Sequence, residues 1–494
     1  MLCPFSGENQ NKIHSEELTP DTPRIAYAGV FIWALIAVIL ALKPSPRILL
    51  PYLAITGALF LIIPFKHSLY LMAIAMLSHN SFEFGFQVKG INFQVVEIIF
   101  VFFIMITLME VITGRIRKIT FTPMLWLFML FICSISLQFV RGIVLGNDPA
   151  LIRTSTRVVM FYILAIPVGI YYSMGNDAKK FIYAMLVGWV ICLIVYLANY
   201  FTVFSSSLFS LTGRMVFPPT YNAIIFIPLL FLIELELFAD DHIGRKLLFV
   251  IIVAASLVVI LLAQTRTIYL NLIIEAIVLL CIILTIYRKD VLRKRVIWKG
   301  IITTGIIFML TVVVMQTFLG ERLNTILFHT LARVKTLCGL RFDLPLIARF
   351  EQVLETITLV KGNWLFGRGL GLEWHSLYYW GYSKIDNMYF TLIGHQGLIG
   401  LIIFISIFAL WVHRSIALIK RISRIEDPVI RAFIILQPAL IISILTTGMM
   451  SGNYYAFPVN LVIVIFCPLT IEYLYKGLIE DNNNSKLEAN VTNS

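Results

Sequence analysis

Charged residues are scarce in this chain of 494 residues. Asp, Glu, Lys and Arg make up 13% of it and hydrophobic residues 59%, whereas soluble globular domains are about one quarter charged. With a mean hydropathy of +0.90, this shortage excludes a cytosolic enzyme and a disordered protein. Cysteine is also rare, and Cys133, Cys192, Cys281 and Cys467 lie inside apolar runs, which excludes a disulfide-stapled scaffold. Lipid is therefore the main solvent of this chain.

Long apolar runs recur along almost the whole sequence. Runs of this length must be helical in lipid, because every backbone N–H and C=O needs a partner within the segment. We therefore predict an all-α, polytopic integral membrane protein with about 14 (12–14) transmembrane helices. The predicted spans are 25–42, 48–65, 68–86, 93–112, 122–140, 158–174, 181–200, 221–238, 247–263, 267–287, 296–319, 388–412, 429–449 and 457–475. The third span is weak, because His79, Asn80 and Glu83 interrupt it, and a re-entrant or interfacial piece is the alternative.

Basic residues are divided unevenly between alternate loops. Loops on one side carry lysine and arginine together, at 115–118, 179–180, 245–246, 288–295 and 414–424. The short loops on the other side carry arginine alone, at Arg141, Arg153, Arg157, Arg214 and Arg266. The first side is predicted to be cytoplasmic, so the net charge of +12 reflects basic cytoplasmic loops and no nucleic-acid partner is expected.

This sidedness divides the chain into five parts. We predict a cytoplasmic tail at 1–24, a first helical part at 25–319, a long outer loop at 320–387, three last helices at 388–475 and a cytoplasmic tail at 476–494. The placement of the first tail requires the weak third span to cross the membrane. Loops of more than about 15 residues tend to be functional, so the site is expected in the long outer loop.

Three motifs stand in or next to the long loop. Residues 346–360 show a helical period of apolar residues, with Glu351 and Glu355 on the other face, which predicts an amphipathic helix on the membrane surface or over a cavity. A glycine-rich stretch follows at 364–371, where backbone N–H groups and Arg368 are candidates to surround a phosphate. Asp386 then precedes a helix expected to begin near Met388. This carboxylate is a candidate helix cap or a general base that deprotonates a sugar hydroxyl, and both roles are compatible.

These motifs together resemble the C-terminal region of the bacterial O-antigen polymerase and O-antigen ligase superfamily. The resemblance covers about 210–412 and rests on Arg349 to Gly371, followed by Asp386-Asn387 and Gly397-Leu-Ile-Gly400. The stretch 213–222, with Arg214 and Asn222, and the element Gln264-Thr-Arg266 are similar to other parts of the family pattern. The ligases of this superfamily have a histidine at the position of Asp386, so the resemblance favours a polymerase.

The resemblance implies a membrane glycosyltransferase of the GT-C-like type in the bacterial inner membrane, with its active site on the periplasmic side. It implies an undecaprenyl-pyrophosphate-linked oligosaccharide as donor and as acceptor, membrane lipids as surroundings and a chain-length regulator protein as a further partner. Arginine's planar fork suits pyrophosphate. The predicted catalytic residues are Asp386, Arg266 and Arg349. The predicted substrate-binding residues are Arg214, Arg153, Arg157, Arg368, Asn222, Asn387 and His395.

Neither a metal nor a cofactor is expected, because His329, His375 and His395 have no ligand spacing to nearby acidic residues. Glu275 lies inside a predicted span, where a charge is costly, and is a further functional candidate. Three alternatives remain open. They are a ligase that transfers glycan to the lipid A core, a flippase or transporter of lipid-linked oligosaccharide, and a cell-wall glycan polymerase.

Overall fold

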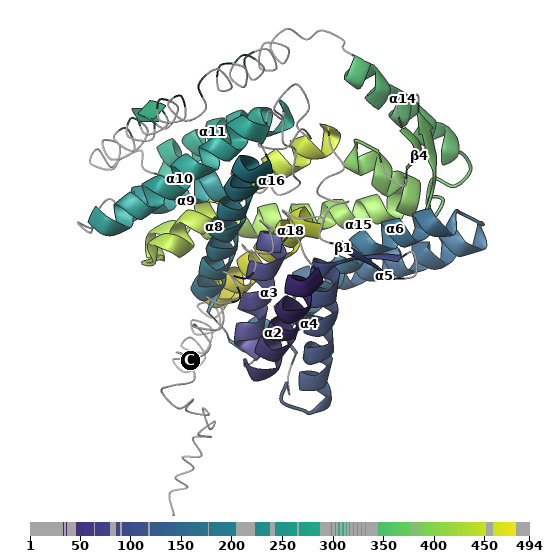
Figure 1. The fold of residues 1–494 in the computed structure, drawn as a ribbon, viewed down its shortest axis with the longest axis horizontal. Coiled ribbons are helices and arrows are strands. Elements are labelled where there is room, and N and C mark those ends of the chain that lie inside the picture. Colours follow the sequence, from purple (N-terminus) through teal and green to yellow (C-terminus); the bar gives the residue numbers. More distant parts are fainter. Residues whose placement is uncertain are drawn as a thin grey trace, which may run out of the picture.

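The computed structural model describes residues 46–63, 65–79, 85–88, 91–116, 119–175, 177–203, 223–237, 243–263, 266–286, 344–376, 379–382, 385–450 and 458–480, with single positions at 33, 36 and between 298 and 331. The described part is mainly a helical bundle (Figure 1). Its first half holds α2 (Pro46–Ile62), α3 (Phe65–His79), α4 (Val95–Ile112), α5 (Pro123–Val144), α6 (Pro149–Val159), η1 (Met160–Leu164), α7 (Ala165–Ser173), α8 (Ala178–Val203), α9 (Ala223–Leu237), α10 (Ile243–Ala263) and α11 (Arg266–Ile286). Its second half holds α14 (Leu344–Leu359), α15 (Met388–Ile419), η3 (Ile422–Arg424), α16 (Pro428–Met450), α18 (Pro458–Tyr475) and the π-helical turn η4 (Lys476–Glu480).

Six helical segments within the described residues are long and apolar enough to cross a membrane: α5, the continuous run from α6 to α7, α8, α11, α15 and α16. Large apolar side chains on their outer faces are exposed, for example Leu137 at 68% and Ile277 at 58%. Apolar belts of this kind are rare on monomeric soluble proteins. The chain is therefore a helical membrane-embedded protein, and the larger number of about 14 spans stays a prediction. The spans at 25–42 and 296–319 fall on residues of which only single positions are described.

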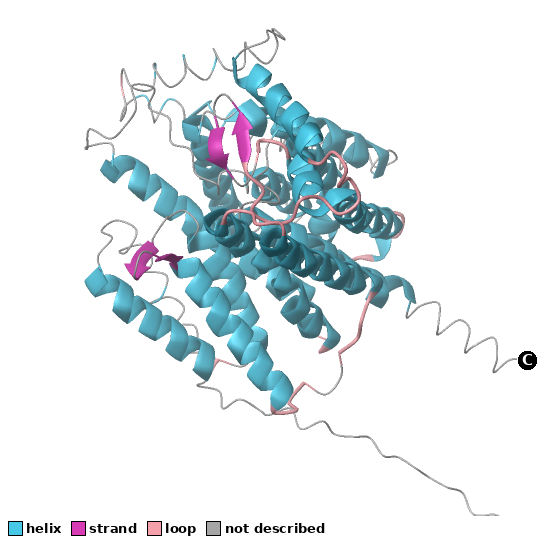
Figure 2. Cartoon of the chain, turned by 90° about the vertical axis from the view of Figure 1, so that its right-hand side faces the viewer, coloured by secondary structure: helices cyan, strands magenta, loops and turns pink. Residues whose placement is uncertain are grey.

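The weak third span differs from its prediction. Its helix α3 ends at His79, and the predicted run up to Phe86 overlaps the strand β1 (Gly85–Val88), which pairs antiparallel with β2 (Ile91–Gln94). The second hairpin pairs β3 (Trp374–Ser376) with β4 (Tyr379–Tyr382). Figure 2 shows the two hairpins apart from each other. The interior of α3 is buried against α8, with Leu69, Met72 and Met76 fully inside.

Helix α15 is the central element for the site. It packs against α5, α16 and α18, and Phe404, Phe408 and Trp411 on its inner face are buried. The predicted start near Met388 is confirmed. Figure 1 shows α14 and β4 side by side at one end of the bundle, near the beginning of α15.

Candidate functional site

Arg349 and Asp386 lie together where α14 meets the beginning of α15. The Nε atom of Arg349 is 3.8 Å from Oδ2 of Asp386, and the two side chains are 34% and 41% exposed. Arg349 belongs to the second turn of α14, and Asp386 directly precedes the first residues of α15. Two segments that are separated in the sequence by a glycine-rich stretch and a hairpin therefore bring one guanidinium and one carboxylate to the same partly exposed place.

Gln352 holds the backbone of Asp386. The Asp386 N–H donates to Oε1 of Gln352 at 3.1 Å, and the Gln352 side chain is 1% exposed. Gln352 follows Arg349 by three residues, so both side chains lie on the same face of α14. Helix α14 thus positions Asp386 through its main chain and faces its carboxylate with Arg349. Gln352 is not among the residues predicted from the sequence, although its spacing of three residues from Arg349 is a signal that the sequence contains.

Helix α14 turns its polar face toward the protein. Helix formation close to the predicted 346–360 is confirmed, and Ala348, Gln352 and Thr356 on its inner face are buried. Of the apolar side chains that gave the periodicity, four are 39–62% exposed, whereas Val360 is fully buried. The four exposed side chains are Ile347, Phe350, Leu354 and Ile357. An apolar face toward the surroundings is the arrangement of a helix at a lipid boundary, and it leaves the polar face for the site.

The β3–β4 hairpin supports α14 from the protein side. The indole N–H of Trp374 donates to Oγ1 of Thr356 at 2.9 Å, and Trp374 is fully buried. The backbone N–H of His375 donates to Oε1 of Glu355. Hydrogen bonds from the first hairpin strand to these two adjacent residues fix the rotation of α14 about its axis, so Arg349 stays directed at Asp386.

Helix α15 is broken at Gly397, where φ is 68° and ψ is −165°. The glycine-rich stretch supplies backbone partners on both sides of this break. The N–H groups of Leu398 and Ile399 donate to the carbonyls of Trp364 and Leu365 at 2.8 and 3.2 Å. In the other direction, the N–H groups of Arg368 and Gly369 donate to the carbonyls of Gly394 and His395, at 2.8 and 3.0 Å. The break therefore leaves these backbone groups paired inside the apolar bundle, as lipid surroundings require.

Two glycines allow this close approach. A Cβ on Gly397 would lie 2.4 Å from the carbonyl carbon of Leu365, and a Cβ on Gly367 would lie 2.6 Å from the backbone nitrogen of Gly397. Both glycines also have positive φ, at 68° and 65°, which other residues adopt only at a cost. The glycines of both sequence motifs thus serve main-chain packing between them.

This packing corrects the expectation that the glycine-rich stretch surrounds a phosphate. The N–H of Gly367 donates to the Asn363 carbonyl, and that of Leu370 donates to the Gln138 carbonyl, at 2.7 and 3.0 Å. Together with the N–H groups of Arg368 and Gly369, these donors are already used within the protein. The side chain of Arg368 is partly buried, and its Nε has no hydrogen-bond partner among the described residues.

The end of α5 clamps the same stretch. Arg141 donates from Nε to the carbonyl of Gly367 at 3.0 Å and from Nη2 to Oδ1 of Asn363 at 2.8 Å. Asn147 donates from Nδ2 to the carbonyls of Arg368 and Leu370, each at 2.9 Å. Arg141, one of the arginines of the outer loops, thus holds a loop of its own protein.

Two other arginines of that group lie on α6. Arg153 is exposed. Arg157 forms a two-pronged ion pair with Glu97 of α4, from Nε to Oε1 at 2.6 Å and from Nη2 to Oε2 at 2.7 Å. This geometry suits arginine and carboxylate well. Because Arg157 is occupied by a protein carboxylate, we no longer place it among the substrate ligands.

Asn387 and His395 also have structural surroundings. Asn387 is the N-cap of α15, since Oδ1 accepts from the Phe390 N–H at 3.1 Å, and its Nδ2 donates to the Met449 carbonyl at 3.0 Å. The prediction that Asp386 caps this helix is therefore wrong, because its neighbour Asn387 is the N-cap. His395 is 2% exposed and lies edge-on to the ring of Trp374, inside the protein and not at the exposed pair.

Three predicted residues are not placed as side chains. Arg214 and Asn222 lie outside the described residues, and Arg266 is described only as the first backbone position of α11. Their predicted roles stay predictions. In the same helix, Glu275 is completely buried, and neither carboxyl oxygen has a hydrogen-bond partner among the described residues. Asn271, one turn earlier, is 1% exposed and equally unsatisfied.

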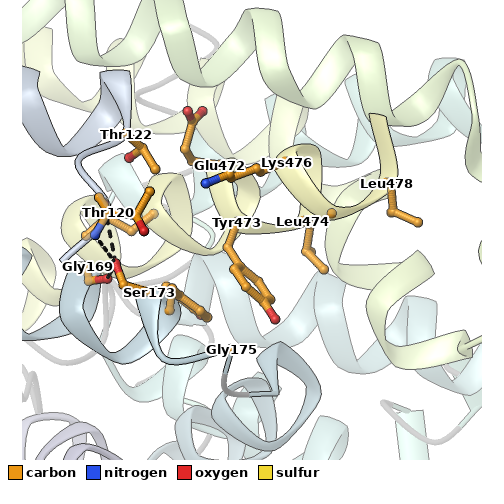
Figure 3. A pocket seen from close by; sticks show the side chains of 13 residues that line it. Thr120, Thr122, Gly169, Ser173, Gly175, Glu472, Tyr473, Leu474, Lys476 and Leu478 are labelled. Atoms are coloured by element: carbon orange, nitrogen blue, oxygen red, sulfur yellow. Dashed lines mark hydrogen bonds between the residues drawn. The ribbon is translucent and has the colours of Figure 1, made fainter. Parts of the chain in front are cut away.

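A cavity of about 390 Å³ lies at the other end of α5, away from the pair of Arg349 and Asp386. Figure 3 shows Tyr473, Lys476 and Thr120 on its wall. Its wall also includes Glu472, which is ion-paired with Arg414 at 2.9 Å. The lysine and arginine residues of the neighbouring loops, at 115–118 and 414–424, predict that this end of α5 is cytoplasmic. None of the residues predicted for catalysis lines the cavity.

The pair of Arg349 and Asp386 combines two chemical abilities at one place. A guanidinium neutralises phosphate oxygens through parallel N–H donors, and a carboxylate accepts a proton from an attacking hydroxyl. No protein-family model and no curated protein matches this chain. The assignment of a function therefore rests on the residues and their geometry.

Proposed function

We propose that this chain is a membrane glycosyltransferase that polymerises undecaprenyl-pyrophosphate-linked oligosaccharide repeat units into a surface polysaccharide, O-antigen or a related polymer. The observation that carries the proposal is the 3.8 Å approach of Arg349 to Asp386 at the beginning of α15. The resemblance of both motifs to the O-antigen polymerase and ligase superfamily supports the same chemistry. An acidic residue at position 386 favours the polymerase over the ligase.

The proposed reaction is a direct displacement. Asp386 takes the proton of the acceptor sugar hydroxyl, whose oxygen forms a bond to the anomeric carbon of the donor. The bond from that carbon to the pyrophosphate oxygen breaks, and its electron pair leaves with the polyprenyl pyrophosphate. Arg349 stabilises the negative charge that builds up on this oxygen, with Arg214 and Arg266 as further proposed members of the clamp. One displacement inverts the anomeric carbon.

The proposed place of this reaction is the periplasmic side of a bacterial inner membrane, with both termini in the cytoplasm. The exclusive use of arginine in the short loops on one side supports this orientation, because lysine is concentrated in the opposite loops. The outward apolar face of α14 supports a site at the lipid boundary, where a substrate with a polyprenyl tail arrives. A chain-length regulator protein is the proposed partner.

A transporter of lipid-linked oligosaccharide is the second candidate, and two observations favour it. Helix α15 is discontinuous at Gly397, and Glu275 is an ionisable group buried in a membrane helix. Both features are common in transporters. However, the exposed carbonyls of broken transporter helices bind ions, whereas the groups beside Gly397 pair with the glycine-rich stretch. We therefore prefer the glycosyltransferase.

The deciding experiment incubates the purified protein with defined undecaprenyl-pyrophosphate-linked repeat units, with and without lipid A core. A ladder of longer lipid-linked glycans without lipid A core supports the polymerase. Product attached only to the core indicates a ligase. Absence of any new glycosidic bond, together with movement of the substrate across a vesicle membrane, overturns the proposal in favour of the transporter. Asp386→Asn serves as the inactive reference, and Arg424→Ala, at an exposed arginine of η3, serves as the active control.

A further inference from the structure

The inner face of α14 carries buried polar atoms that the described protein does not use. They are Nε2 of Gln352, Oε2 of Glu355 and Oε2 of Glu351, and none has a hydrogen-bond partner among the described residues. All three lie within little more than one turn of helix, directly after Arg349. A buried polar atom without a partner destabilises a fold by about 1–3 kcal/mol, so three in one place require an explanation.

The other atom of two of these side chains is fixed by the protein. Oε1 of Gln352 accepts the Asp386 N–H at 3.1 Å, and Oε1 of Glu355 accepts the His375 N–H. Each side chain is therefore held at one atom while the second remains unused. Thr356, on the same face, differs, because its hydroxyl donates to the Gln352 carbonyl and accepts from Trp374. The unused atoms thus lie on the part of α14 between Arg349 and Thr356.

We propose that this face of α14 binds neighbouring hydroxyls of the sugar next to the bond being formed, with Gln352 as donor and Glu355 as acceptor. The inference rests on the proposed function. Sugar hydroxyls both donate and accept hydrogen bonds, so an amide N–H and a carboxylate oxygen three residues apart suit a pyranose with adjacent free hydroxyls. A second phosphate does not suit this place, because Glu351 and Glu355 would repel it.

The order of residues along α14 then sets the direction of the substrate. Arg349 takes the pyrophosphate end, and Glu355 lies six residues further on, about 9 Å along the helix axis at 1.5 Å per residue. Gln352 stands between them and also holds the main chain of Asp386. Sugar binding and the position of the proposed base are therefore linked through a single side chain.

The test compares binding of two probes to the purified full-length protein. One probe is undecaprenyl pyrophosphate without sugar, and the other is the lipid-linked repeat unit extracted from the native host. The variant Glu355→Gln keeps the oxygen that accepts from His375 and replaces only Oε2 by an N–H donor. Glu373→Gln is the matched control, because Glu373 is 41% exposed and interacts with the His375 side chain at 3.6 Å, outside α14.

We expect Glu355→Gln to weaken binding of the sugar-bearing lipid about tenfold or more, the effect of one hydrogen bond to a charged group, and to leave undecaprenyl pyrophosphate binding unchanged. Gln352→Glu, which keeps the Asp386 contact, should show the same selectivity. Arg349→Ala should weaken both probes. Equal binding of the sugar-bearing lipid by Glu355→Gln, Gln352→Glu and the wild type overturns the sugar site alone. If the wild type binds neither lipid, the proposed function itself fails.

Discussion

Replacing Arg349 by alanine distinguishes a catalytic role from a structural one, because the two roles predict different losses of folding stability and of catalytic rate. The partners Arg349 and Asp386 are 3.8 Å apart, and both side chains are more than one third exposed. Ion pairs of this kind contribute about 0–1 kcal/mol to the free energy of unfolding. Arg349→Ala should therefore lower the unfolding temperature only slightly, and the protein should accumulate in the membrane at the wild-type level.

The effect on catalysis should be much larger. Removing one preorganised donor to a developing negative charge lowers kcat about 10²–10³-fold, which is about 3–4 kcal/mol of transition-state stabilisation. The assay measures the rate of chain extension on defined lipid-linked repeat units, with thermal unfolding of the same samples. Arg424→Ala, at an exposed arginine of η3 on the predicted cytoplasmic side, is the matched control and should keep the wild-type rate. Wild-type rates and chain lengths in Arg349→Ala would refute the role of Arg349.

Three further predictions concern the scaffold. Gly397→Ala places a Cβ in contact with backbone atoms at positive φ and should lower the unfolding free energy by about 3 kcal/mol or more. The control Gly114→Ala has a similar φ but no atom within 4 Å of the added Cβ, so it should lower the unfolding free energy by only about 1–2 kcal/mol. Equal losses of the two variants in chemical denaturation would contradict this prediction. Arg157→Leu should lower the free energy of unfolding by roughly 3 kcal/mol, because it removes the ion-pair partner Arg157 from the Glu97 carboxylate. In a double-mutant cycle, adding Glu97→Leu should restore much of that loss. Although burial alone would raise the pKa of Asp427, a lysine partner and backbone N–H groups hold this pKa below its ordinary value, so the ionised carboxylate stabilises the fold at neutral pH. This contribution is lost as the pH falls below about 4, and Asp427→Asn should flatten the acid limb of a thermal-unfolding profile.

Most helices could be predicted from hydropathy, because a lipid-embedded backbone has few alternatives to a helix. Most spans from α5 to α11 and from α15 to α18 lie close to their predicted limits. However, the span predicted at 158–174 begins already at Pro149, and the one predicted at 388–412 continues to Ile419. The β1–β2 hairpin was missed, since averaging over a long window hides alternation in short segments. Phe86, Val88, Ile91 and Phe93 alternate with polar residues or glycine, which is the strand period. That pattern was the available signal for ending the third span earlier.

The candidate site could be predicted in part. The order of motifs indicated Arg349 and Asp386 as partners, and the structure places them together. The contacts of Arg141 with Gly367 and of Arg157 with Glu97 could not be predicted in the same way, because a sequence does not show which carboxylate or carbonyl occupies an arginine. An arginine in an outer loop is equally suited to a substrate phosphate and to a protein oxygen. Only the geometry separates these two uses.

The break at Gly397 suits the proposed site, which needs exact placement of Asp386 at the beginning of α15. A continuous helix would transmit every tilt of its long membrane part to the residues at its end. In α15, the short segment before Gly397 is bonded through its last carbonyls to the glycine-rich stretch, which α5 holds through Arg141. At its other end Asn387 caps the segment and binds α16, while Gln352 holds Asp386 from α14. The half-helix that follows Asp386 is thus held by the glycine-rich stretch, α16 and α14, in addition to its connection to the remainder of α15. A substitution that straightens α15 should therefore displace Asp386 from Arg349 and reduce chain extension even where the helix itself still forms.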